Sequence, residues 1–82
     1  MMALVELSGE EAKFILDNIF VVEELEAALK SCAGKSGYYQ VEFDCMEASL
    51  AIGDLIHLSK SIKSNEKLIL IDSICQMLER AV

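Results

Sequence analysis

The stretch that decides the fold lies at residues 8–34 and reads SGEEAKFILDNIFVVEELEAALKSCAG. Ser8 and Glu11 have the spacing of a capping box, in which the two side chains bind free amides at the start of a helix. Gly34 stands where a left-handed residue commonly ends a helix. The sequence therefore predicts one helix over about residues 9–33.

Apolar residues occupy two sides of this predicted helix at 100° per residue. The main apolar face comprises Phe14, Ile15, Val21, Val22, Leu25, Leu29 and Cys32. A second stripe on the opposite side comprises Leu16, Phe20 and Ala27. One neighbouring helix layer cannot cover both sides, and bare apolar patches are unusual on monomers. We therefore predict a homodimer or higher oligomer with these three residues as the candidate interface. The alternative is a monomer whose strand ribbon covers the stripe.

Two short segments with alternating polarity flank the helix and predict strands. Residues 2–7 place Ala3, Val5 and Leu7 on one face. Residues 38–43 place Tyr39, Val41 and Phe43 on one face, with Tyr38, Gln40 and Glu42 on the other. We expect a two-stranded ribbon, paired either within one chain or across a dimer axis.

Two further helices are predicted at about residues 45–62 and 66–81. Asp44 is the expected N-cap of the first, and Ser64 or Asn65 that of the second. Each helix has a broad apolar face.

The predicted fold class is mainly α, a three-helix domain with a minor two-stranded β ribbon in the order β-α-β-α-α. Residues 1–82 are expected to form a single small helical domain, because a length of 82 residues is within the usual range for one domain.

The composition is apolar for so short a chain. Hydrophobic residues make up 54% of the sequence, against a usual ~45–50%. They occur in short runs such as residues 19–22 and 68–71, whereas a membrane-spanning helix needs about 20 consecutive apolar residues. The excess apolar surface is therefore expected in a core or an interface, not in a membrane.

The chain is also acidic, with a formal charge of −7 from 14 acidic and 7 basic residues. Nucleic acids and anionic membranes attract basic surfaces, so neither is an expected partner. Two interpretations remain. The charge keeps a small protein with a high apolar content in solution, or it attracts a basic partner protein.

Three cysteines, Cys32, Cys45 and Cys75, are widely spaced. A small secreted scaffold would carry an even and denser set, and the N-terminus lacks the basic and apolar segments of a signal peptide. We expect a cytoplasmic location.

No pattern of residues indicates catalysis, a cofactor or a metal. His57 is the single histidine, and twelve helical residues, about 18 Å, separate it from Cys45. Zinc sites normally use closely paired ligands, which the three cysteines do not form. Asp54 and His57 have the i, i+3 spacing of an ordinary exposed helix face. We therefore predict that the protein is not an enzyme and holds no cofactor or metal.

The function predicted from the sequence is a non-catalytic protein–protein interaction module, a small acidic oligomer that binds or inhibits a partner protein. Tyr38, Glu23 and Glu24 are the candidate partner-binding residues, because Tyr38 is an outward-facing aromatic and the two glutamates flank the second stripe. One alternative is a structural self-assembling protein. Another is a small enzyme or ligand carrier with a pocket between subunits. The residues identify no family.

Overall fold

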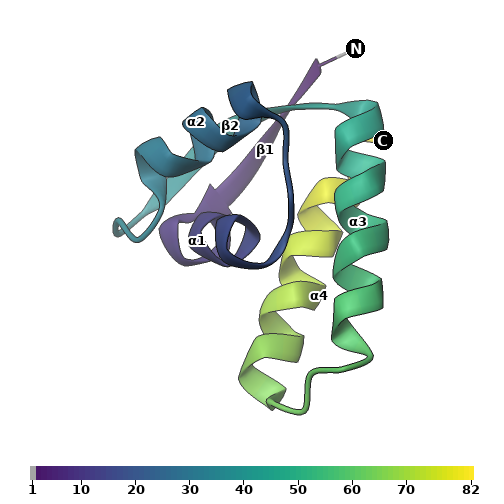
Figure 1. Cartoon of the computed structure of the whole chain (residues 1–82). Coiled ribbons are helices and arrows are strands. Elements are labelled where there is room, and N and C mark those ends of the chain that lie inside the picture. Colours follow the sequence, from purple (N-terminus) through teal and green to yellow (C-terminus); the bar gives the residue numbers. More distant parts are fainter. Residues whose placement is uncertain (1) are drawn as a thin grey trace.

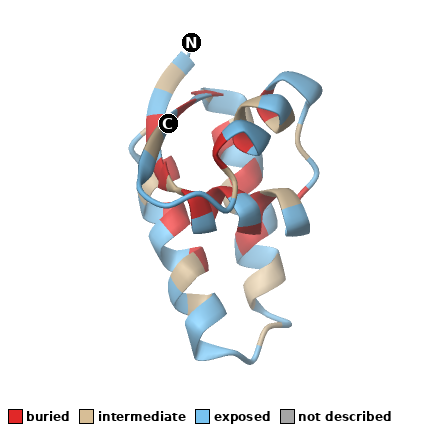
Figure 2. Cartoon of the chain, turned by 90° about the vertical axis from the view of Figure 1, so that its left-hand side faces the viewer, coloured by how far each residue is buried: buried red, intermediate tan, exposed pale blue. Residues whose placement is uncertain are grey.

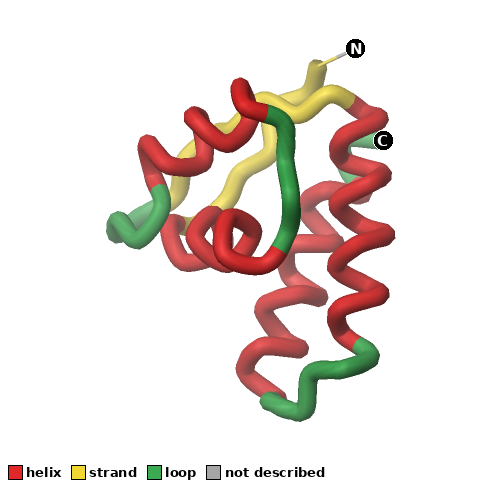
Figure 3. Tube along the Cα trace, viewed as in Figure 1, coloured by secondary structure: helices red, strands yellow, loops and turns green. Residues whose placement is uncertain are grey.

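The computed structural model describes residues 2–82, and within them four helices accompany a two-stranded sheet (Figure 1). In chain order the elements are β1 (Met2–Ser8), α1 (Gly9–Asn18), α2 (Glu23–Cys32), β2 (Tyr38–Asp44), α3 (Cys45–Ser59) and α4 (Asn65–Glu79). Helices α3 and α4 form a hairpin whose loop end projects away from the sheet (Figures 1 and 3). Their buried positions lie toward the sheet, and the projecting end is exposed (Figure 2).

The two strands pair with each other in an antiparallel register that sets Val5 opposite Val41 and Ala3 opposite Phe43. The predicted alternation is confirmed, because Val5, Leu7, Val41 and Phe43 are buried while the residues between them are exposed. The ribbon therefore forms within one chain.

The prediction of a single helix over residues 9–33 is wrong. Helix α1 ends at Asn18 and α2 begins at Glu23, so the order is β-α-α-β-α-α with four helices in place of three. The connection at residues 19–22 is extended where it leaves α1 and where it enters α2.

The local sequence explains this break. Three of the four residues at 19–22 are β-branched and lose side-chain freedom in a helix. The side-chain amide of Asn18 (Nδ2) donates to the main-chain carbonyl oxygen of Phe14 at 2.9 Å, an interaction typical of residues that compete with helical hydrogen bonding. Glutamates at 23, 24 and 26 then favour a new helix start, because they lie at the positive end of its dipole.

The predicted capping box is confirmed. The Ser8 hydroxyl accepts from the amide of Glu11 at 3.1 Å, and the Glu11 carboxylate accepts from the amide of Ser8 at 2.8 Å. The second carboxylate oxygen of Glu11 accepts from the hydroxyl of Ser73 in α4 at 2.8 Å. Glu11 is only 6% exposed, so one buried carboxylate fixes both the start of α1 and its contact with α4.

The two C-terminal helices correspond to the predictions for residues 45–62 and 66–81, but α3 ends at Ser59 and α4 at Glu79. Ser64 caps α4 by accepting from the amide of Lys67 at 3.4 Å. Asp44 occupies the N-cap position of α3, although its side chain makes no capping hydrogen bond there.

The turn between α2 and β2 packs directly on the start of α1. The Gly9 carbonyl oxygen accepts from the amide of Gly34 at 2.9 Å, and Gly34 has the predicted left-handed conformation, with φ of 77°. A Cβ atom at Gly9 would overlap the main-chain carbonyl oxygen of Lys35. Only glycine permits this close approach without a shift of the backbone.

We expect Gly9→Ala to destabilise the protein by about 1–3 kcal/mol, because the added methyl group meets backbone that cannot rotate away. The matched control is Gly53→Ala in α3, where no atom beyond the adjacent residues and the backbone of the helix itself lies within 4 Å of the added Cβ. Alanine is preferred over glycine in a helix, so the control should gain about 0.5–1 kcal/mol. Urea unfolding measures both; equal effects of the two substitutions would contradict the described packing of Gly9.

We expect Glu11→Ala to lower the free energy of unfolding by about 2 kcal/mol, because it removes the reciprocal cap and leaves the Ser73 hydroxyl without its acceptor. Glu10→Ala is the control, since Glu10 is an exposed glutamate in the same first turn. Its loss should cost less than about 1 kcal/mol. Similar urea midpoints for the two variants would show that Glu11 does not act through its buried contacts.

Candidate functional site

The cysteines do not form a chemical site. Cys32 and Cys75 are buried, Cys45 is exposed, and all three are free thiols. Burial raises the pKa of the Cys75 thiol, and the nearby Glu79 and Asp72 carboxylates raise it further. The thiol at 75 is therefore neutral at neutral pH and acts as a small core side chain.

Cys45 and His57, considered together for catalysis, also lie apart, whereas Asp54 and His57 line one pocket beside α3. Cys45 is the first residue of α3, and His57 lies in its last turn. Across residues 2–82, no group of three or more His, Cys, Asp or Glu side chains is placed to hold a metal ion.

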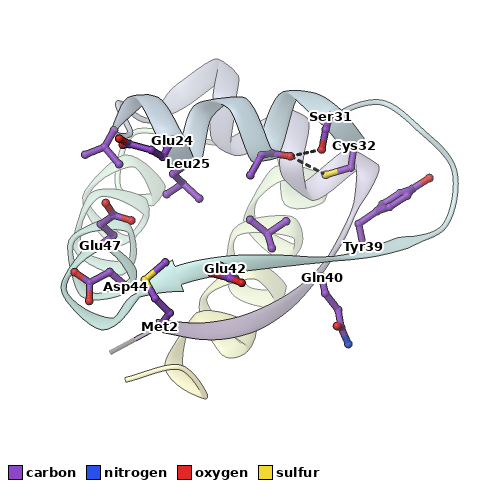
Figure 4. Close-up of a pocket in the computed structure, with 13 residues that line it drawn as sticks. Met2, Glu24, Leu25, Ser31, Cys32, Tyr39, Gln40, Glu42, Asp44 and Glu47 are labelled. Atoms are coloured by element: carbon purple, nitrogen blue, oxygen red, sulfur yellow. Dashed lines mark hydrogen bonds between the residues drawn. The ribbon is translucent and has the colours of Figure 1, made fainter.

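The candidate site is a groove of about 730 Å³ between α2 and β2 (Figure 4). From α2 it is lined by Leu25, Ala28 and Cys32, which recur every three or four residues and so share one face of the helix. From the strand, Val41 and Tyr39 complete an apolar floor. The groove thus exists because α2 folds back beside the strand that follows it.

The groove follows the outer edge of β2. The consecutive residues Tyr39, Gln40, Val41 and Glu42 all line it, although successive side chains of a strand point to opposite faces. A surface lined by both sets of side chains runs along the strand edge. Because β2 pairs with β1 alone among the described residues 2–82, this edge has no neighbouring strand there.

The groove carries negative charge at one end. Glu24 from α2, Asp44 at the end of β2 and Glu47 from α3 gather there (Figure 4). Glu42 adds a fourth carboxylate to the lining. No lysine or arginine is found among the described residues that line it, so the groove favours a cationic group.

The structure places the three predicted partner-binding residues on different surfaces. Glu24 lines the groove, whereas Glu23 is an exposed neighbour outside its lining. Tyr38 is 72% exposed and lines a second pocket of about 360 Å³, on the side of α4, together with Glu6 and Ile69. The structure therefore connects only Glu24 with the groove.

The three predicted interface residues lie on three segments instead of one helical stripe. Leu16 in α1 is half-buried and packs against the core. Phe20 lies in the connection between α1 and α2 and is 93% exposed, and Ala27 is exposed on α2. The stripe inferred from a continuous helix is wrong, because the chain is not helical between Asn18 and Glu23. The role of these residues in an interface stays a prediction.

The sequence patterns did not reveal the groove. They identified the alternating strand and the apolar face that includes Leu25 and Cys32, but a continuous helix would not have returned along β2. The signal that was available is the β-branched run at 19–22, which marks the point where the chain turns.

No helix in the part of the chain that the structure describes has both the length and the apolar content needed to cross a membrane. Comparison with known proteins found no matching family model, no similar curated protein and no similar solved structure.

Proposed function

We propose that this protein is a non-catalytic protein–protein interaction module, a small acidic oligomer that binds a partner protein and can thereby inhibit it. The observation that carries this proposal is Phe20, a large aromatic side chain that is 93% exposed on a chain of only 82 residues. Burial of a phenylalanine side chain stabilises a protein by about 1.5–3 kcal/mol. Phe20 makes almost none of this contribution to the core of this protein.

The backbone holds Phe20 in this exposed position. Ile19 is buried before it and Val21 is partly buried after it. The amide of Ile19 donates to Ile15 at 2.9 Å, and the carbonyl of Val22 accepts from Glu26 at 2.8 Å. Figure 3 shows this connection as the loop that joins α1 to α2. A side chain presented by an anchored segment loses little freedom on binding, which supports a role as a contact residue.

Further apolar side chains are exposed around the molecule. They are Met2, Leu4, Val22, Tyr38, Met46, Leu50, Ile56, Ile69 and Val82. Scattered exposed apolar residues are normal, so Phe20 is distinguished by its size, its near-complete exposure and its fixed backbone. We infer that Phe20 forms the centre of the self-association surface, and that the acidic charge of −7 favours a basic partner protein over a neutral one.

We expect the protein to show an oligomeric mass by light scattering after size exclusion, and Phe20→Glu to reduce it to the 9.1 kDa monomer. Since Phe20 contributes little to the core, the free energy of unfolding of the variant should lie within about 0.5 kcal/mol of that of the unsubstituted protein. The control is Ser49→Glu, which adds the same charge at an exposed position of α3 and should leave the mass unchanged.

A monomeric mass for the unsubstituted protein over the whole concentration range would contradict self-association. An oligomer that survives Phe20→Glu would place the contact elsewhere. A mass that keeps growing with concentration would favour the alternative of an open structural assembly, because closed two-fold contacts stop at a fixed size.

A further inference from the structure

We propose that the groove between α2 and β2 binds an extended, basic segment of a partner protein, which joins the sheet as a third strand along the free edge of β2. This inference rests on the proposed function as an interaction module and specifies the surface and the chemistry of the bound segment.

The first support is the open strand edge. Strand β2 has seven residues, Tyr38–Asp44, and in the described part of the chain it pairs on one side, with β1. Alternate residues of a strand direct their amide and carbonyl groups to the same side, so part of the β2 main chain faces the groove. Apart from the pairing with β1, the described hydrogen bonds join no main-chain group of residues 39–43 to main chain elsewhere. An open edge of this kind is a template for an added strand.

The second support is the form of the groove. Figure 4 shows α2 running beside β2, with Glu24 and Glu47 near one end and Tyr39 near the other. A seven-residue strand extends over about 23 Å. An extended segment in the groove would therefore lie between a helix wall and a strand edge. Its side chains on one face would meet Leu25 and Ala28.

The third support is charge, which also selects the occupant. Glu24, Glu42, Asp44 and Glu47 line the groove, and lysine or arginine on the added segment would complement them. A second copy of this chain, paired through its own β2, would bring two sets of these carboxylates together. Like charges across a strand pair are destabilising, and charged edges are a known protection against self-pairing. The groove therefore fits a basic segment better than another copy.

The probe that tests this is the labelled peptide acetyl-Lys-Val-Lys-Val-Lys-Val-Lys-amide, titrated with the protein at low salt and followed by fluorescence anisotropy. We expect saturable binding, with NMR amide shifts concentrated in residues 24–32 and 38–44. The same peptide with glutamate in place of lysine should not bind. The same peptide with every amide N-methylated keeps its charge but cannot donate main-chain hydrogen bonds, and it should lose most of its binding.

Two double variants of the protein serve as test and control, and each loses two negative charges. Glu24→Gln with Glu47→Gln removes two first-turn glutamates at the groove, and should weaken peptide binding about tenfold. Glu10→Gln with Glu66→Gln removes two first-turn glutamates of α1 and α4 that do not line it, and should change binding less than about twofold. Circular dichroism checks that both variants keep their helices.

Equal binding of the N-methylated peptide would overturn strand addition, and equal weakening by the two double variants would overturn the groove as the site. A Phe20→Glu protein that still self-associates with all four groove carboxylates intact, and whose amide shifts on dilution are concentrated in residues 38–44, would show that a second copy occupies the edge, which also overturns the proposal. These outcomes are separate from the test of self-association, because peptide binding can fail while the oligomer persists.

Discussion

The buried carboxylate of Glu11 is the interaction on which the arrangement of the elements depends. It accepts from the amide of Ser8 and from the hydroxyl of Ser73, two residues that are far apart in the sequence. A carboxylate removed from water is costly unless hydrogen bonds compensate it. The local cap of α1 is therefore tied to the correct position of α4. Because Ser8 also ends β1, the same contact fixes how the sheet meets the helices.

The break at residues 19–22 has consequences for the whole shape. A continuous helix over residues 9–33 would be about 37 Å long at 1.5 Å per residue, whereas the longest dimension of the fold is 32 Å. The break lets α2 turn back and lie beside β2, where it completes the core with Leu25 and Leu29. It also creates the groove and leaves Phe20 outside. Both proposed binding surfaces thus arise from one short extended segment.

Features set by near neighbours in the sequence could be predicted, and features set by tertiary packing could not. The Ser8 and Ser64 caps, the alternation of the two strands and the C-terminal helices depend on residues a few positions apart. The helix count was wrong because the apolar period continues through 19–22, although three β-branched residues there disfavour a helix. The groove depends on where α2 packs against β2, and no local pattern encodes that position. The sequence pattern did predict that Phe20 is a candidate contact residue, but it did so from an apolar stripe along one continuous helix, and the chain does not form that helix.

The two proposed surfaces differ in chemistry, and this links them energetically. The proposed contact through Phe20 is apolar and would bring acidic chains together, so the charge of −7 on each copy would oppose it at low salt. A basic segment in the groove near Glu24 and Glu47 neutralises part of that charge on the copy that binds it. Binding of the segment would then favour association, and by reciprocity association would favour binding by the same factor. If both proposals hold, a chain with an apolar contact point and an acidic strand edge would couple its assembly to the presence of a basic partner, without any change in its fold.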